Sequence, residues 1–303
     1  MKTYFECIPC FFRQAIETVN MLHLSEAKKH NVINEIAQKI QFFPKHKSPP
    51  EFARIMYKVI KEHSKVADPF KHRKHYSNVT ALKVYDHLKR KVSHSKGSLL
   101  TAVELAAIGN VIDYGIKSTL NVEKEINKIL TKETKFVKNN KKAVFDFKEF
   151  EHTLKKAKNI LYIGDNAGET VFDRILIEYI KAHYPIKNVF YAVKKSPIIN
   201  DATLEDAVFC GLDKSCQIIS SGSDAPGTIL KLCDPNFLKV YRKADMVISK
   251  GQGNFETLSH AMKPIFFLFM AKCDVIVKNV SKTHGFCDLG NINLIYNAKH
   301  KIQ

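Results

Sequence analysis

The hydrophobic pattern of the chain changes near residue 142. Before that point apolar residues recur at spacings of three and four, the period of an amphipathic α-helix, and no strand pattern is convincing. We therefore predict a helical N-terminal domain over residues 1–141. Its helices are expected at Cys10–Leu22, Ser25–Phe43, Glu51–Ser64, Val79–Val92, Leu99–Tyr114 and Val122–Thr131.

After that point short apolar runs alternate with amphipathic stretches. Strands are expected at Asn159–Ile163, Asn188–Val193, Gln217–Ser220, Met246–Ser249, Ile265–Met270 and Ile292–Tyr296. Helices are expected at Glu169–Ala182, Ala202–Phe209, from Thr228 through Leu232 onward, and Phe255–Ala261. This repetition predicts an α/β domain over residues 142–303, with a mostly parallel sheet covered by helices on both faces.

Polar residues and glycines are concentrated in the loops after the first four strands. These loops span 164–169, 194–201, 220–228 and 249–254, and they contain carboxylates, carboxamides, hydroxyls and lysines. Because crossover connections are right-handed, such loops collect at one edge of a parallel sheet, where open sheets bind their ligands. We expect all four loops to line one crevice, with Asp245, just before the fourth strand, as a supporting residue.

The chemistry of these loops suits a divalent metal ion beside a phosphate. Oxygen ligands without nearby His or Cys favour Mg²⁺ or Mn²⁺. Glycine-rich backbone and helix N-termini favour phosphate. Together they indicate phosphoryl chemistry, in which the ion polarises a phosphoryl oxygen and lowers the pKa of a bound water. Asp165 is then a catalytic metal ligand, Glu169 orients or deprotonates the water, and Lys250 neutralises the phosphate.

The remaining polar residues of these loops are candidates for substrate binding. The predicted substrate-binding residues are Asn166, Ser221, Lys250, Gly251 and Asn254. For any single Asp in these loops an ordinary helix N-cap is an equal alternative, and we interpret Asp224 in that way.

Composition narrows the class of protein. The chain of 303 residues has 48 Lys and Arg against 30 Asp and Glu, a net charge of +18. Because Lys greatly outnumbers Arg, the better residue for bidentate phosphate recognition, nucleic-acid binding is not expected as the main function. No uninterrupted apolar run could span a membrane, and the N-terminus lacks a signal-peptide pattern. Seven cysteines, an odd number, argue against a disulfide framework, so we expect a cytoplasmic protein.

Two further pairs of residues are candidates for a role. Cys7 and Cys10 form a single C-x-x-C, which fits a redox pair, half of a second metal site completed by Cys273 or a histidine, or two cysteines packed at a helix start. Asn110 and Asp113 lie three residues apart on an apolar helix. They either close the crevice or cap the helix end near Gly115.

Several of these motifs together resemble one known family, the metal-dependent damage-control phosphatases, formerly a domain of unknown function and also called acidic-residue methyltransferase-like. The resemblance covers nearly the whole chain. It is carried by residues 6–10 (ECIPC), 109–115 (GNVIDYG), 164–169 (GDNAGE), 197–203 (PIINDAT) and 244–256 (ADMVISKGQGNFE). The C-x-x-C start is similar to the branch typical of archaea.

The resemblance implies a Rossmann-like three-layer α/β/α core with a helical N-terminal part. It implies hydrolysis of small phosphometabolites, such as sugar phosphates or damaged cofactor phosphates. The metal ligands would be Asp165, Asn166 and Asp201, holding Mn²⁺, Ni²⁺, Co²⁺ or Mg²⁺. Glu169 and Lys250 match phosphate-site positions of the family.

The resemblance leaves some points open. Family members often carry Arg-Gly before the proline of the second loop, where this chain has Lys195-Ser196, so the substrate is not specified. Two alternatives are an S-adenosylmethionine-dependent carboxyl methyltransferase and a non-catalytic protein that binds a phosphorylated ligand or RNA. The expected partner is a small phosphorylated metabolite, no membrane is involved, and the sequence does not specify the oligomeric state.

Overall fold

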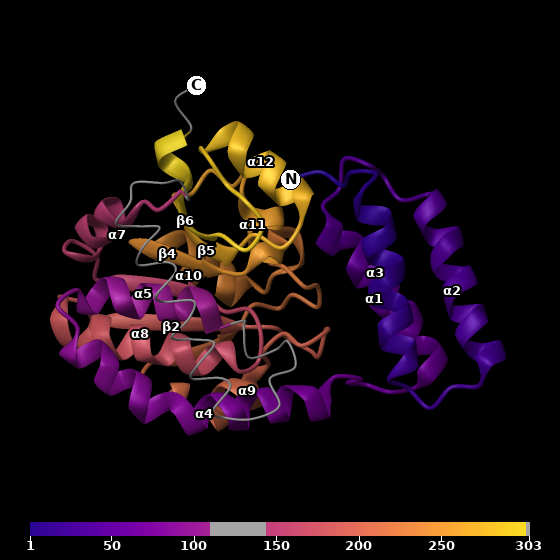
Figure 1. Cartoon of the computed structure of the whole chain (residues 1–303), viewed down its shortest axis with the longest axis horizontal. Helices are drawn as coiled ribbons and strands as arrows, with labels where there is room; N and C mark the ends of the chain where they lie inside the picture. The colour runs from indigo at the N-terminus through magenta and orange to yellow at the C-terminus, as the bar shows by residue number, and fades with distance from the viewer. Residues whose placement is uncertain (110–143, 301–303) are drawn as a thin grey trace.

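A six-stranded sheet forms the centre of the molecule in the computed structural model, which describes residues 1–109 and 144–300 (Figure 1). The strands are β1 (Asn159–Ile163), β2 (Asn188–Val193), β3 (Gln217–Ser220), β4 (Met246–Lys250), β5 (Phe266–Met270) and β6 (Ile292–Tyr296). Their order across the sheet is β3-β2-β1-β4-β5-β6. The first five strands are parallel to one another, and β6 pairs antiparallel with β5.

Helices cover both faces of this sheet. One face packs against α4 (Lys71–His94), α5 (Ser98–Ile108), α7 (Phe147–Leu154) and α8 (Glu169–His183). The other packs against α10 (Pro235–Lys243), α11 (Gln252–Leu258) and α12 (Asp274–Thr283). The short α9 (Leu204–Phe209) lies near β3 and α4. The two-residue period of the strands explains both cores, because in β1 Ile160 and Tyr162 enter the first and Leu161 and Ile163 enter the second. The predicted three-layer α/β/α architecture is confirmed.

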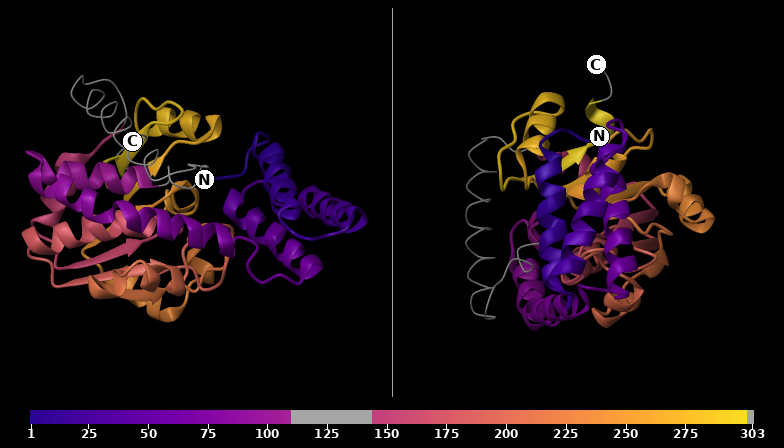
Figure 2. Two further views of the ribbon diagram at one scale, coloured as in Figure 1. Left: turned by 60° about the horizontal axis from the view of Figure 1, so that its bottom comes forward. Right: turned by 90° about the vertical axis from the view of Figure 1, so that its right-hand side faces the viewer.

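The first three helices form a separate unit. They are α1 (Cys7–Asn20), α2 (Glu26–Gln41) and α3 (Pro49–Ser64), and they enclose their own apolar core (Figures 1 and 2). A capping box between Ser48 and Glu51, with Pro49 in the first turn, defines the start of α3. Ile198, from the loop after β2, is buried in this core. The three-helix unit therefore packs against the carboxyl edge of the sheet.

Helices α4 and α5 belong to the sheet and not to the three-helix unit. α4 begins at Lys71, eight residues before the predicted start at Val79, because the apolar pattern does not extend over the basic residues of its first turns. The predicted division of the chain at residue 141 lies outside the described residues and stays a prediction, as do the helix at Val122–Thr131 and the end of the helix predicted at Leu99–Tyr114. Within the described ranges no helix is long and apolar enough to cross a membrane.

Candidate active site

The candidate site lies where the connections of the sheet change direction. β1 is flanked by β2 on one side and by β4 on the other, so the loops after β1 and β4 begin next to each other at the carboxyl edge. Open α/β sheets bind ligands at such a switch point. The loop after β2 joins them, because the Ala202 N–H donates to the Asp165 carbonyl at 2.8 Å and the Ala167 N–H donates to the Asn200 carbonyl at 2.9 Å. The first and second loops therefore meet directly.

Three predicted residues of the first loop form one hydrogen-bonded cluster. The Asn166 Nδ2 donates to Asp165 Oδ2 at 2.9 Å and to Glu169 Oε1 at 2.8 Å. All three side chains are buried. Because both amide hydrogens of Asn166 are engaged by carboxylates, its carbonyl oxygen is the atom left for another ligand. Asn166 and Asp201 also face each other across an antiparallel bridge, so the predicted metal ligands lie together.

Lys250 ends β4 and carries positive charge into this cluster. Its Nζ donates to Glu169 Oε2 at 3.0 Å and to Asp173 Oδ1 at 2.8 Å. Burial alone would lower the pKa of Lys250, but the carboxylates of Asp173 and Glu169 raise it above its usual value. Lys250 is therefore a fixed ammonium ion, as a group that binds phosphate requires.

Asp201 and Lys194 form a buried ion pair in the second loop. Lys194 Nζ lies 3.4 Å from Asp201 Oδ2, and within residues 1–109 and 144–300 neither atom has a hydrogen-bond partner. Burial raises the pKa of Asp201 to about 6, against the lowering effect of Lys194. Burial, with the Glu169 and Asp201 carboxylates nearby, also raises the pKa of Asp165 well above its usual value. The crowded carboxylates favour an additional cation.

The donor set fits a hard divalent cation. Asp165, Asn166 and Asp201 offer two carboxylates and an amide oxygen, the ligand type that Mg²⁺ and Mn²⁺ prefer. Asp201 Oδ2 is buried without a hydrogen-bond donor among the described residues, which a coordinated ion would correct. The same part of the chain holds no group of three or more His, Cys, Asp or Glu side chains placed to bind a metal. The predicted set differs from such a group because Asn166 is one of its members.

The fourth loop contacts the metal-ligand cluster through its backbone. A Cβ on Gly251, whose φ is 80°, would lie 2.1 Å from Asp165 Oδ2. Asn254 Nδ2 donates to the carbonyls of Lys250 at 2.8 Å and Gly164 at 3.2 Å, and its Oδ1 accepts from the Thr228 hydroxyl at 2.8 Å. Asn254 therefore joins three of the loops, and its amide group is fully engaged in doing so.

Two of the predicted site residues, Asp245 and Ser221, do not contact this cluster. Asp245 lies at the opposite, amino edge of the sheet, because a residue that precedes a parallel strand is at the strand's start; there its Oδ2 accepts from the N–H groups of Lys158 and Asn159. The supporting role expected for Asp245 in the crevice is wrong. Ser221 is buried in the loop after β3, and its hydroxyl accepts from the Ser223 N–H at 3.3 Å.

The interpretation of Asp224 as a helix N-cap is also wrong. No helix begins there, and its carboxylate pairs with Arg54 of α3 at 2.5 Å. A helix of the N-terminal unit thus contacts the third loop by an ion pair.

The remaining candidates stay predictions. Cys7 is buried in the first turn of α1, Cys10 is exposed, and neither forms a disulfide. Burial raises the pKa of the Cys7 thiol to about 11, the opposite of what a reactive thiolate needs. Asn110 and Asp113 lie outside the described residues.

The structure adds residues that sequence reasoning missed. Asp173 is completely buried and accepts hydrogen bonds from Tyr162 at 2.6 Å, Tyr191 at 2.8 Å and Lys250. The sequence does contain one indication of Asp173, because it is a carboxylate four residues after Glu169 in a largely apolar helix. Asn78 of α4 accepts from the Gly168 N–H at 2.7 Å and donates to Asp206 at 2.9 Å. No local pattern marks Asn78, because its partners are distant in sequence.

Comparisons with known proteins agree with this fold and identify a family. A family model described as the damage-control phosphatase ARMT1-like domain matches residues 3–286. The chain is 37% identical over 290 residues to the damage-control phosphatase PH1575 of Pyrococcus horikoshii, covering 94% of this chain and 96% of that protein. It is 37% identical to the uncharacterized protein MJ0202 of Methanocaldococcus jannaschii over 92% of each chain. The crystal structure of PH1575, described as a DUF89 family protein, superimposes with a TM-score of 0.87 at 34% identity, covering 98% of this chain and 99% of that one.

Proposed function

This chain belongs to the damage-control phosphatase family and is a phosphohydrolase, and we propose that it is a metal-dependent phosphomonoesterase whose active site is the cluster around Asp165. The observation that carries this proposal is the convergence of Asp165, Asn166 and Asp201, with one buried carboxylate oxygen lacking a hydrogen-bond donor among the described residues, beside the buried ammonium of Lys250. The substrates would be small phosphorylated metabolites, such as sugar phosphates or damaged cofactor phosphates.

In this proposal Asp165, Asn166 and Asp201 hold a divalent ion, Mn²⁺, Ni²⁺, Co²⁺ or Mg²⁺. When bound, the ion supplies positive charge to the phosphoryl oxygens and lowers the pKa of a bound water. Lys250 adds a second positive charge for the developing charge on the phosphoryl group. Glu169, whose two oxygens accept hydrogen bonds from Asn166 and Lys250, orients the attacking water and accepts its hydrogen bond.

Asp173 and Asn254 are proposed as positioning residues. Asp173 shares the Lys250 ammonium with Glu169, and its own carboxylate is held by Tyr162 and Tyr191. Asn254 keeps the first, third and fourth loops at fixed distances through its three hydrogen bonds. The polar atoms of both side chains are already engaged, so neither is proposed to contact the substrate, and Asn254 takes a positioning role in place of the substrate-binding role predicted for it.

The experiment that tests this function is phosphate release from a panel of phosphometabolites. Metal-stripped protein is compared with protein resupplied with Mn²⁺, Co²⁺, Ni²⁺ or Mg²⁺, and Asp165→Asn is compared with Asp213→Asn, an exposed aspartate before β3. We expect metal-dependent turnover that falls by about 100-fold or more in Asp165→Asn and is unchanged in Asp213→Asn. A folded wild-type protein that releases no phosphate with any metal would refute the proposal. Binding of S-adenosylmethionine and of RNA is measured on the same preparations, because the sequence allows both alternatives.

A further inference from the structure

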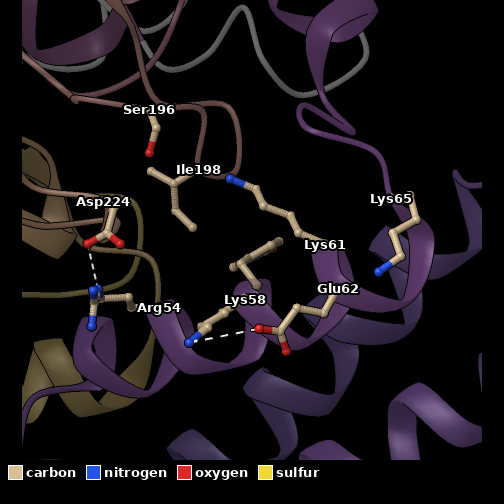
Figure 3. Close-up of a pocket in the computed structure, with 9 residues that line it drawn as sticks. Arg54, Lys58, Lys61, Glu62, Lys65, Ser196, Ile198 and Asp224 are labelled. Carbon is tan, nitrogen blue, oxygen red and sulfur yellow. Dashed lines mark hydrogen bonds and ion pairs between the residues drawn. The ribbon is translucent and has the colours of Figure 1, made fainter.

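A basic cleft separates α3 from two of the active-site loops. Its volume is about 280 Å³, and it lies between α3 and the loops that follow β2 and β3 (Figure 3). Arg54, Lys58, Lys61 and Lys65 line it from the helix, and Ser196, Ile198 and Asp224 line it from the loops. Arg54, Lys58 and Lys61 follow helical spacings of four and three, so they lie on the face of α3 that meets the loops, and Lys65 lines the cleft directly after the helix ends.

The charges in this cleft are unequal. Four basic side chains line it, against only two acidic ones, Glu62 and Asp224. Asp224 is engaged by Arg54, while Glu62 lies 3.8 Å from Lys58 in a solvent-exposed pair of little energetic value. The ammonium of Lys61 points toward the second loop (Figure 3). It donates to the Pro197 carbonyl. The cleft therefore has a surplus of positive charge at its walls, which favours an anionic ligand.

The second loop connects this cleft to the proposed metal site. Ser196 and Ile198 line the cleft, and Asp201, a proposed metal ligand, follows three residues later with its N–H bonded to the Ile198 carbonyl at 3.1 Å. Between them Ile199 has a φ of 38°, a strained conformation for a β-branched residue of the kind found at functional sites. Tyr57 also lines the cleft, on its helical wall.

From these observations we propose that the cleft binds a second anionic group of the substrate, at the end away from the phosphate that is hydrolysed. The inference rests on the proposed phosphatase function and names its substrate class: small metabolites that carry two anionic groups, a second phosphate or a carboxylate. A small metabolite fits a cleft of about 280 Å³ between a helix and two loops, whereas a nucleic-acid duplex is too large for it.

The test compares substrates that differ only in the second anion. One pair is glucose 1,6-bisphosphate and glucose 6-phosphate, and the other is 3-phosphoglycerate and glycerol 3-phosphate. The variant is Lys58→Met, and its control is Lys39→Met on α2, because both lysines are exposed and both lie 3.8 Å from a glutamate four residues away. For each pair we compare the kcat/KM of the substrate that has the second anionic group with the kcat/KM of the substrate that lacks it. We expect Lys58→Met to lower this ratio by about 3- to 10-fold at low salt, mainly through KM.

The controls distinguish a failure of the cleft from a failure of the phosphatase proposal. An unchanged ratio in Lys58→Met, or an equal fall in Lys39→Met, would overturn the assignment of the cleft. A fall with the bisphosphate pair alone identifies a phosphate site, and a fall with both pairs identifies a site for any anion. If the wild type releases no phosphate, the proposed function fails by itself, and the cleft is tested by calorimetry. Tighter binding of glucose 1,6-bisphosphate than of glucose 6-phosphate, weakened by Lys58→Met, supports the cleft, and equal binding overturns it.

Discussion

Gly251 lies so close to Asp165 of the proposed metal site that no side chain fits at its position. Its φ of 80° disfavours any residue with a Cβ, and a Cβ there would overlap the Asp165 carboxylate. We expect Gly251→Ala to reduce phosphate release by at least about 10-fold and to weaken Mn²⁺ binding, because Asp165 must move. Activity and Mn²⁺ binding by calorimetry measure both effects.

The matched control for this change is Gly290→Ala. Gly290 has nearly the same φ, 78°, but a Cβ there would meet nothing within 4 Å. Both variants place a Cβ at a positive φ, but only the one at Gly251 meets the Asp165 carboxylate, so a larger loss in Gly251→Ala reports that contact. Equal losses of activity in the two variants would contradict the account of Gly251.

Asp165 illustrates a conflict between stability and function at a single residue. It is buried beside the carboxylates of Glu169 and Asp201, and that crowding disfavours its charge in the absence of metal. We therefore expect metal-stripped Asp165→Asn to be more stable than metal-stripped wild type by about 1–3 kcal/mol. Thermal unfolding with and without Mn²⁺ measures this, and Mn²⁺ should raise the Tm of the wild type alone. A lower Tm of the metal-stripped variant would show that the carboxylate is not under electrostatic strain.

At the scale of elements, Glu178 joins helix α8 to α4 and to the segment before β3. Its carboxylate accepts hydrogen bonds from Tyr85 and Lys89 of α4, both at 2.6 Å, from Arg174 at 2.7 Å and from Ser215 at 3.0 Å. Burial alone would raise the pKa of Glu178, but these donors, Lys89 first among them, lower it to about 2. A glutamate with a lowered pKa stabilises the fold above its ordinary pKa of 4.5, and this stabilisation is lost as the pH falls toward about 2.

The corresponding prediction concerns Glu178→Gln. Because the site is partly open to solvent, we expect the free energy of unfolding to fall by about 1–2 kcal/mol at pH 7. The difference from wild type should shrink between about pH 4.5 and pH 2. Urea unfolding across this pH range measures it. A difference that stays constant with pH would mean that Glu178 acts through packing and not through its charge.

The strands and helices also show which parts of the fold can be predicted from the sequence. Four strands have the predicted bounds, and the other two differ by one residue, because short β-branched and aromatic runs between polar loops are a local signal. The helix expected from Thr228 is wrong: a 3₁₀ turn at Leu230–Leu232 comes first, and α10 begins only at Pro235, since proline suits a first helical turn. α7 and α12 were missed, although each buries a pair of apolar residues four apart, Phe150 and Leu154 in α7 and Ile276 and Val280 in α12.

The residues of the candidate active site also differ in whether the sequence alone could predict them. Parallel topology brings together at one edge the residues at or beyond the carboxyl ends of strands. These are Asp165, Asn166, Glu169, Asp201 and Lys250, the last of which ends β4. Asn78 acquires its importance from Gly168, which is distant in the chain and which no local pattern records. The partner of Asp173, Lys250, is also distant, so the sequence marks Asp173 only as a carboxylate in a largely apolar helix. Asp245 was predicted to support the crevice, but it directly precedes β4. A residue at the start of a parallel strand lies at the amino edge of the sheet, opposite the candidate site.

At the scale of the whole molecule, the three-helix unit is joined to the site by the second loop. Ile198 inserts into the apolar core of that unit, while the same loop carries Lys194 and Asp201. The chain reverses between these residues through the strained backbone of Ile199. Packing of the helices therefore helps to hold a proposed metal ligand in place, and changes in the helical core at Ile198 should reach the site through this loop.

Ile198→Ala tests this coupling against Ile36→Ala, which lies in the same helical core but on α2. Both side chains are buried, so each substitution should cost about 2–4 kcal/mol of folding free energy. Below the unfolding temperature, we expect only Ile198→Ala to raise KM and weaken Mn²⁺ binding, because only Ile198 belongs to the loop that carries Asp201. Urea unfolding, calorimetry with Mn²⁺ and steady-state kinetics measure the three effects. Equal kinetic defects in both variants would mean that the whole helical unit, and not the loop alone, determines the geometry of the site.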